Sequence, residues 1–461
     1  MKIDDIHNIY FVGIGGIGMS ALARWFQQRG SKVAGYDRVR TSLCARLEEE
    51  GMAIHYQDGI DFIDEIYKDR EKTLVVYTPA IPSDHKELNY FFGNSFVVMK
   101  RSEVLGVITE DHFTIAIAGT HGKTTTSSMV AHILNGSKGG CSAFVGGIMS
   151  NYDSNLIVGG KDAPVVVEAD EFDRSFMRLH PDFTVVTSID PDHLDIYGDT
   201  HTIQQSYVDF MRLTDRDGKI LLHEVVARHI GEKLARAFRS YGLESAEILA
   251  KNIRIEEGSF VFDYIGDYEI RNIKIQLPGF HNINNAVAAI TAAIHQGMSA
   301  GQIREQVESY RGVKRRFEYL IRSPELVYID DYAHHPSEIE ALIISVRKLY
   351  SKKKITVVFQ PHLYSRTKDF QEGFARTLDM ADEVFLLDIY PARELPIEGV
   401  TSSIIYDKMK LEKKWRCSKE DFPSILDKTE VEVIVTVGAG DIDTLVNPIR
   451  DFYLKKHGLE V

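Results

Sequence analysis

The chain has 461 residues, of which 44% are hydrophobic and 26% are charged, and its formal net charge at pH 7 is -13. This average composition excludes a disordered, collagen-like or coiled-coil chain, and the length suggests about three domains. The negative charge argues against a surface built for nucleic acid or an anionic membrane, and because no apolar run approaches the ~20 residues that span a bilayer, we expect a cytoplasmic protein.

Three successive stretches of the chain repeat a short β-branched strand, a glycine-rich or polar turn and a helical pattern. This alternation predicts an α/β fold with parallel sheets. The first stretch opens with a strand at residues 8–12 and a helix at about 19–29. The pattern restarts near residues 106 and 320, which predicts domain boundaries there. Alternating polarity at residues 260–268 predicts antiparallel strands inside the second stretch.

The first turn matches the GxGxxG pattern of phosphate-binding turns between a strand and a helix. Its glycines are Gly13, Gly15, Gly16 and Gly18, and Asp37 follows at the end of the next strand. Glycines in such a turn permit close approach to a pyrophosphate, and the acid can meet a ribose. A nicotinamide cofactor is one interpretation, but the same geometry would hold the diphosphate of any nucleotide-linked substrate.

The strongest motif is GTHGKTTT at residues 119–126, which follows a buried-looking strand at 114–118 and opens a helix. Backbone N–H groups of such a turn surround phosphates together with the helix N-terminus. Lys123 would reach the β- and γ-phosphates, and the Thr124 hydroxyl would join a Mg²⁺ shell. The motif departs from GxxxxGK because Ile117 stands where the first glycine is expected. The order of strand, turn and helix still predicts a nucleotide site.

Acids and a histidine follow two further strands of the second stretch. Glu168 comes directly after the apolar residues 165–167, in a run with four acids in six residues. Carboxylates suit a hard divalent cation, although a solvated acidic loop is the alternative for the other acids of the run. His193 follows a neighbouring strand, within residues 190–195. Because parallel strands end at one edge of an open α/β sheet, we expect Glu168 and His193 to act on a metal or a phosphate.

Two clusters of polar residues further along the chain have more than one possible role. His281 and Asn285 stand at the start of an amphipathic helix, where amides often only cap the helix. The pair Arg315 and Arg316 fits a solvated linker and a phosphate contact equally well, since arginine forks onto phosphate oxygens.

The third stretch contains two polar clusters that follow successive strands. The clusters lie at residues 330–336 and 360–367. Their positions at the ends of neighbouring strands predict a ligand crevice. Arg366 is the natural partner for a small carboxylate in that crevice.

Together these motifs resemble the Mur ligase family over nearly the whole chain. Eight of them occur in the family's order: GIGGIGMS at 13, GTHGKTTT at 119, EADEFD at 168, DPDHLD at 190, GFHNINNAVAAI at 279, RGVKRRFE at 311, DDYAHHP at 330 and FQPHLYSRT at 359. The resemblance implies an ATP-dependent amide ligase of peptidoglycan precursor synthesis, with ATP as co-substrate and Mg²⁺ or Mn²⁺ as cofactor. It also implies three domains: a UDP-sugar-binding Rossmann-like domain at residues 1–106, a central ATP-binding P-loop domain at 107–320, and a C-terminal Rossmann-like, amino-acid-binding domain at 321–461.

One absence narrows the expected substrate within the family. The members that add the second and third residues use a carbamylated lysine after the metal histidine, and this chain has no lysine between His193 and Lys219. This pattern resembles the members that attach L-alanine or a whole tripeptide, and GIGGIGMS at 13 favours the alanine-adding one. The resemblance thus implies ligation of L-alanine to the lactyl carboxylate of UDP-N-acetylmuramate through an acyl phosphate, giving ADP and phosphate. A recycling ligase that joins a murein tripeptide to the same sugar remains an alternative, as does a nicotinamide-dependent dehydrogenase. The expected assembly is a monomer or weak homodimer without nucleic acid or membrane partners.

The resemblance also assigns roles to individual positions. The metal ligands would be Thr124, Glu168 and His193. The residues that bind ATP would be Gly119, Thr120, His121, Gly122, Lys123, Thr124, Thr125, His281, Asn285, Arg316 (with Arg315 as the alternative) and Asp331. The residues that bind the UDP-sugar would be Gly13, Gly15, Gly16, Gly18, Met19, Ser20 and Asp37. The alanine would meet Tyr332, His362 and Arg366, and His362 is the candidate general base. The expected catalytic set is Lys123, Glu168, His193, Arg366 and His362.

Overall fold

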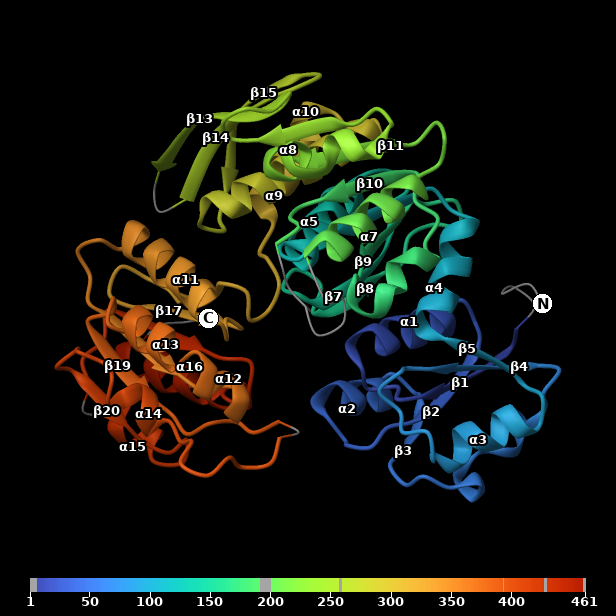
Figure 1. The fold of residues 1–461 in the computed structure, drawn as a ribbon, viewed down its shortest axis with the longest axis horizontal. Coiled ribbons are helices and arrows are strands. Elements are labelled where there is room, and N and C mark those ends of the chain that lie inside the picture. The colour runs from blue at the N-terminus through green and yellow to red at the C-terminus, as the bar shows by residue number, and fades with distance from the viewer. Residues whose placement is uncertain (1–5, 191–199, 257–258, 393, 427–428, 459–461) are drawn as a thin grey trace. The chain divides into compact units, whose positions relative to one another are not determined.

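The structure is a computed structural model that describes residues 6–190, 200–256, 259–392, 394–426 and 429–458 (Figure 1). Its strands form three sheets, so the predicted α/β fold class is confirmed. Contacts divide the chain into two compact units, residues 1–276 with 280–310 and residues 277–279 with 311–461. The domain boundaries at 106 and 320 stay predictions. Within the described ranges, no helix has the length and apolar character that a bilayer span requires.

The first sheet has five parallel strands in the order β3-β2-β1-β4-β5, the arrangement of a Rossmann-like half. Its strands are β1 (Asn8–Val12), β2 (Lys32–Tyr36), β3 (Ala53–His55), β4 (Thr73–Tyr77) and β5 (Val97–Lys100), with helices α1 (Ile17–Gln28), α2 (Ser42–Glu49), α3 (Lys86–Gly93) and α4 (Arg101–Glu110). Helix α1 begins two residues earlier than predicted, so Gly18 lies in its first turn. A Cβ atom on Gly18 would lie 2.7 Å from Nη1 of Arg101, so Gly18 lets the Arg101 side chain pack closely on this helix.

The second sheet has ten strands in the order β15-β14-β13-β12-β11-β10-β6-β9-β7-β8. Its strands are β6 (Thr114–Ala118), β7 (Ser142–Met149), β8 (Ser154–Ile157), β9 (Val165–Ala169), β10 (Phe183–Val186), β11 (Lys219–His223), β12 (Arg239–Gly242), β13 (Ile248–Glu256), β14 (Ser259–Ile265) and β15 (Glu269–Ile275). Its helices are α5 (Lys123–Asn135), α7 (Thr200–Arg212), α8 (Glu224–Ile230), α9 (Phe280–His295) and α10 (Ala300–Ser309). Strand β6 pairs in parallel with both β9 and β10, so the three carboxyl ends are neighbours. The antiparallel pairing of β14 with β13 and β15 confirms the prediction from alternating polarity.

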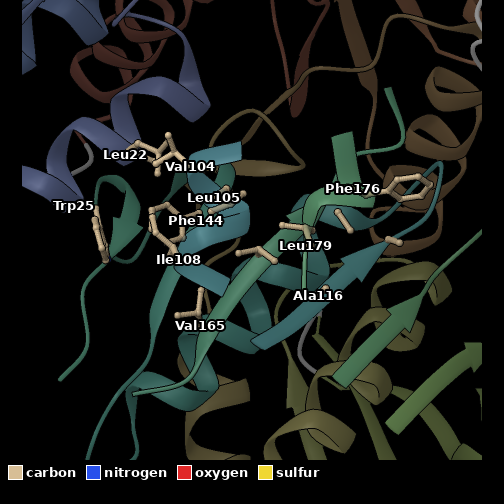
Figure 2. Close-up of a cluster of buried hydrophobic side chains, with 14 of the residues drawn as sticks. Leu22, Trp25, Val104, Leu105, Ile108, Ala116, Phe144, Val165, Phe176 and Leu179 are labelled. Atoms are coloured by element: carbon tan, nitrogen blue, oxygen red, sulfur yellow. The ribbon is translucent and has the colours of Figure 1, made fainter. Parts of the chain in front are cut away.

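One hydrophobic cluster joins these first two sheets (Figure 2). Trp25 of α1 lies with its ring centroid 6.2 Å from that of Phe144 on β7, and both side chains are buried. Val104 and Ile108 of α4 belong to the same cluster. Each large apolar side chain buried in this way contributes about 1.5–3 kcal/mol of stability. The shared core explains why both sheets belong to one compact unit.

The second unit contains a six-stranded sheet in the order β16-β17-β21-β18-β19-β20. Its strands are β16 (Glu318–Arg322), β17 (Val327–Asp331), β18 (Ile355–Phe359), β19 (Glu383–Leu386), β20 (Lys414–Arg416) and β21 (Val433–Val437). Its helices are α11 (Pro336–Leu349), α12 (Tyr364–Asp369), α13 (Gln371–Leu378), α14 (Ser403–Tyr406), α15 (Phe422–Leu426) and α16 (Asp443–His457). All pairings except β16 with β17 are parallel, so the turns after β17, β18 and β21 meet at one edge.

Candidate active site

The turn between β6 and α5 is held in place by the end of β10. The Thr187 hydroxyl donates to the His121 carbonyl (2.5 Å) and lies 3.1 Å from the Ala118 carbonyl, and the His121 N–H donates to the Ser188 hydroxyl (2.7 Å). Gly119 has a φ of +133°, and a Cβ atom on it would lie 2.2 Å from Oγ1 of Thr187. Among the described residues, no side chain caps the start of α5. The helix N-terminus, with Thr120 and Thr125 beside it in sequence, is therefore open to an anion.

Lys123 lies back over this turn, and its partner is an acid that sequence reasoning did not single out. Its Nζ donates to the Gly119 carbonyl at 2.7 Å and to both carboxylate oxygens of Glu171 at 2.9 and 2.8 Å. Glu171 is only 4% exposed. Four acids within six residues gave no signal to distinguish Glu171 from its neighbours. The predicted lysine is thus held by a buried carboxylate in this structure.

Glu168 at the end of β9 lies beside α5, as its predicted metal role requires. Its Oε2 accepts from the Thr124 hydroxyl at 3.2 Å, and its Oε1 accepts from the Ser127 hydroxyl at 3.2 Å and from the Gly146 N–H at 2.6 Å. The Thr124 hydroxyl and the Glu168 carboxylate are two oxygen ligands on neighbouring elements. They fit a hard cation that completes its coordination shell with water and phosphate oxygens. His193 falls outside the described residues. In the part of the chain that is described, no group of three or more acidic, histidine or cysteine side chains is placed to hold a metal.

Asn285 on α9 lies against the same helix. Its Oδ1 accepts from the Thr126 hydroxyl at 3.1 Å, and a Cβ atom on Gly122 would lie 3.0 Å from that oxygen. Gly122 has a φ of +85°, a conformation that favours glycine. His281 is exposed on the first turn of α9. The structure therefore brings Asn285 to the turn between β6 and α5.

The first glycine turn is closed by the acid that the sequence pairs with it. Oδ2 of Asp37 accepts from the Gly15 N–H at 2.7 Å, and a Cβ atom on Gly15 would lie 2.9 Å from that oxygen. Gly13 has a φ of +92°, and Gly16 precedes α1 without a side-chain cap. The Asp37 side chain therefore stabilises the backbone of this glycine turn.

The side chains of Met19 and Ser20, which were predicted to bind the UDP-sugar, lie in the interior of the protein. Both are buried, and the Ser20 hydroxyl donates to the Ile17 carbonyl (2.9 Å) and accepts from Nδ2 of Asn155 on β8 (3.1 Å). Arg101, which sequence reasoning missed, packs on Gly18 and lies 3.9 Å from Oδ2 of Asp170. The contacts of these side chains therefore join α1 to the second sheet.

In the second unit, Asp331 ends β17 and holds the backbone just before β16 and just after β17. Its carboxylate accepts from the N–H groups of Phe317 (2.7 Å) and Ala333 (2.8 Å), and burial raises its pKa to about 6. The neighbouring arginines differ. Arg315 donates to the Gly438 carbonyl at 2.6 Å and lies 5.1 Å from the Tyr332 ring, whereas Arg316 is exposed. Arg316 also interacts with Asp331, so the choice between the two arginines as a phosphate contact stays a prediction.

The turn after β18 carries His362 and Arg366. Burial and the nearby Arg366 guanidinium lower the pKa of His362 to about 4, so its ring is neutral at pH 7. The ring stacks on Tyr390 with centroids 5.8 Å apart. Glu394, a second residue that sequence reasoning missed, accepts from the Ser365 N–H at 3.0 Å and from the Ser365 hydroxyl. Glu394 thereby holds the short helix that presents Arg366.

Three family models match successive parts of the chain. They are described as "Mur ligase family, catalytic domain" (residues 8–113), "Mur ligase middle domain" (117–293) and "Mur ligase, glutamate ligase domain" (315–442). The chain is 46% identical to the UDP-N-acetylmuramate–L-alanine ligase of Cytophaga hutchinsonii, with 99% of each chain covered. It is 49% identical to the enzyme of that name from Flavobacterium johnsoniae, with 98% of each covered.

The chain is also similar to solved structures. The UDP-N-acetylmuramate-alanine ligase of Thermotoga maritima is similar with a TM-score of 0.81 at 28% identity, covering 97% of this chain and 99% of that one. A murein peptide ligase from Psychrobacter arcticus has a TM-score of 0.68 at 21% identity, covering 99% of both chains. At that identity the second comparison shows a shared fold alone.

Proposed function

The chain belongs to the Mur ligase family, and from this premise we propose that it joins L-alanine to the lactyl carboxylate of UDP-N-acetylmuramate with hydrolysis of ATP to ADP and phosphate. The observation that carries the choice of substrates is identity of 46–49% across 98–99% of both chains to ligases of that name. This reaction is a step of peptidoglycan precursor synthesis. The geometry of the turn at Lys123 supports the ATP-dependent half of it.

The reaction needs ATP because a free carboxylate has no adequate leaving group. A carboxylate oxygen attacks the γ-phosphorus, the bond to the β-phosphate oxygen breaks, and ADP leaves. The amine of L-alanine then attacks the acyl carbon, loses a proton and expels phosphate, which forms the amide. Charge develops on the phosphate oxygens in the first step. Lys123 and the N-terminus of α5 are the groups of this chain that would stabilise it.

Thr124 and Glu168 are the described residues that would hold a divalent cation. A Mg²⁺ or Mn²⁺ ion bound there would neutralise negative charge on the phosphates of ATP. His193 would hold a second metal ion or orient the lactyl carboxylate. Asn285 is placed beside the nucleotide turn, where its contact with Thr126 would position it for the base of ATP.

The first sheet would bind the UDP-sugar. Its glycine turn and the uncapped start of α1 are suited to a diphosphate. Gly13, Gly15 and Gly16 would contact the phosphates through their backbone. Met19 and Ser20 would act through helix packing, since both are buried. Oδ2 of Asp37 accepts from the Gly15 N–H and Oδ1 accepts from the Val39 N–H at 3.3 Å, so a ribose hydroxyl would bond to a remaining lone pair of this carboxylate.

The second unit would bring the amino acid. Arg366 would bind the carboxylate of L-alanine through a forked pair of hydrogen bonds, with Tyr332 beside the site. His362, the candidate general base, is neutral at pH 7 and so has a ring nitrogen that can accept a proton, but its lowered pKa makes it a weak base for an ammonium. Asp331 and Arg316 would contact the ribose and phosphate of ATP from this unit.

A phosphate-release assay across amine substrates tests the function directly. With UDP-N-acetylmuramate and ATP, we expect L-alanine to support phosphate release and the murein tripeptide L-alanyl-γ-D-glutamyl-meso-diaminopimelate to support little. Faster release with the tripeptide would make the protein a recycling ligase. NADH binding without ATP-dependent ligation would favour a dehydrogenase, which explains residues 13–37 but leaves the turn at Lys123 without a role.

Replacement of Arg366 by alanine should raise the KM for L-alanine. Loss of a charge-assisted contact to the substrate carboxylate costs about 1.5–3 kcal/mol, which corresponds to a decrease in kcat/KM for L-alanine of roughly 10- to 150-fold. Steady-state kinetics with varied L-alanine measure this, and the KM values for ATP and the UDP-sugar should stay near those of the unchanged enzyme. Lys368→Ala, an exposed cation on the same helix, is the matched control. Equal kinetics for Arg366→Ala would remove Arg366 from the alanine site.

A further inference from the structure

The buried ion pair between Lys123 and Glu171 occupies the turn that should bind phosphates. Glu171 stands at the start of the turn after β9, three residues beyond Glu168, and its side chain is 5% exposed against 16% for Lys123. Both of its carboxylate oxygens contact the ammonium, at 2.9 and 2.8 Å. Glu168, in contrast, is held by α5 and Gly146 and does not share this contact. The two acids of this strand end therefore serve different groups.

The hydrogen-bonding capacity of Lys123 is fully used in this arrangement. An ammonium has three N–H donors. Lys123 places them toward the Gly119 carbonyl at 2.7 Å and the two oxygens of Glu171, with the Thr120 carbonyl a more distant acceptor at 3.4 Å. A phosphate oxygen can bond to this ammonium only if one of these acceptors gives way.

Glu171 is the acceptor that can move. The Gly119 carbonyl belongs to a turn fixed against β10, where the Gly119 Cα approaches Thr187 too closely to admit even a Cβ atom. Glu171 contacts Lys123 through the end of a flexible side chain. Entry of a phosphate would therefore replace the carboxylate of Glu171 on Lys123 and leave the backbone contact in place.

We propose that Glu171 is a positioning residue that holds Lys123 in the nucleotide-free enzyme and competes with the phosphates of ATP for it. This inference rests on the proposed function, because it takes Lys123 as a phosphate-binding group. A buried carboxylate that loses its cation carries a cost that the incoming ligand must offset. The competition therefore favours ligands with several phosphate charges over a single phosphate, and it lowers nucleotide affinity below what Lys123 alone would give.

Nucleotide binding by Glu171 variants tests the competition. Glu171→Gln keeps the size of the side chain and one acceptor oxygen but removes its charge, so the dissociation constant for ADP, measured by calorimetry in EDTA, should fall by at least about threefold. A merely structural role predicts weaker binding. Asp170→Asn, at the adjacent acid that lies 3.9 Å from Arg101, is the matched control and should change the constant by less than about 1.5-fold.

A variant without the lysine distinguishes competition for Lys123 from a general effect of removing one negative charge. In the Lys123→Met variant, adding Glu171→Gln should leave the dissociation constant for ADP unaltered. The ammonium for which Glu171 and the phosphates compete is absent from that variant. An unchanged or higher constant in Glu171→Gln, or an equal fall in both backgrounds, would overturn the inference. If Glu171→Gln does not fold, Glu171→Asp decides: its shorter carboxylate should still tighten binding, and weaker binding contradicts the competition.

The same measurements separate the inference from the function on which it rests. If the unchanged protein does not bind ADP, the proposed function fails. If it binds ADP and the affinity ignores both Glu171 substitutions, only the role of Glu171 fails.

Discussion

Replacement of Lys123 by methionine should reduce ATP-dependent phosphate release by at least about 10²-fold in kcat/KM for ATP, the scale of losing one preorganised charge-stabilising group. The ammonium lies over the turn at Gly119, 2.7 Å from its carbonyl, where β- and γ-phosphates would sit. Methionine keeps the length and apolar stem of the side chain and removes its charge. The loss should therefore fall on the phosphoryl-transfer step, which single-turnover formation of ADP measures.

Lys138→Met provides the control for this prediction, because Lys138 is exposed beyond the end of the same helix. It should keep the activity of the unchanged enzyme. Since Lys123→Met also leaves Glu171 buried without its cation, the melting temperature should fall, and retained binding of the UDP-sugar should show that the fold persists. Turnover equal to that of the unchanged enzyme would remove Lys123 from the reaction.

Replacement of Glu168 by glutamine should change the metal requirement. The amide retains an acceptor for Thr124, Ser127 or Gly146 but loses the negative charge that a divalent cation needs. We expect the Mg²⁺ concentration that gives half-maximal activity to rise at least about tenfold, and the maximal rate to fall by about 10²-fold. Titration of Mg²⁺ at saturating ATP measures both quantities.

The matched control for Glu168→Gln is Asp162→Asn, an exposed acid that precedes the other end of β9. It should leave the Mg²⁺ dependence as it is. If Glu168→Gln and the unchanged enzyme respond identically to Mg²⁺, the carboxylate does not bind the metal, and its contacts with α5 and Gly146 are structural.

Local pattern was enough to predict the elements that carry the nucleotide turn. The strand before Gly119 and the helix that starts at Lys123 follow from neighbouring residues, since β-branched runs favour strands and a glycine turn ends in an open helix N-terminus. The placement of Glu168 next to that turn also followed, because parallel strands end at a common edge. The antiparallel strand β14 was foreseen from alternating polarity alone.

Pattern was insufficient where contacts join residues far apart in the chain. Ser20 stands in a glycine-rich motif that suggests a ligand contact, yet its hydroxyl meets Asn155, which lies in another sheet. Arg101 belongs to no motif, and only the packing of α4 on Gly18 brings it to the first glycine turn. Glu394 stands outside the polar clusters and still holds the helix of Arg366.

The family, the α/β class, the two glycine turns and the residue types at the strand ends could all be predicted, because they depend on order along the chain and on short-range backbone preferences. Which acid meets which cation depends instead on the three-dimensional fold. Glu168 and Glu171 are three residues apart and chemically alike, but the path of the chain after β9 turns one toward Thr124 and the other onto Lys123. That choice depends on burial and on the positions of distant partners, which periodicity along a chain does not encode.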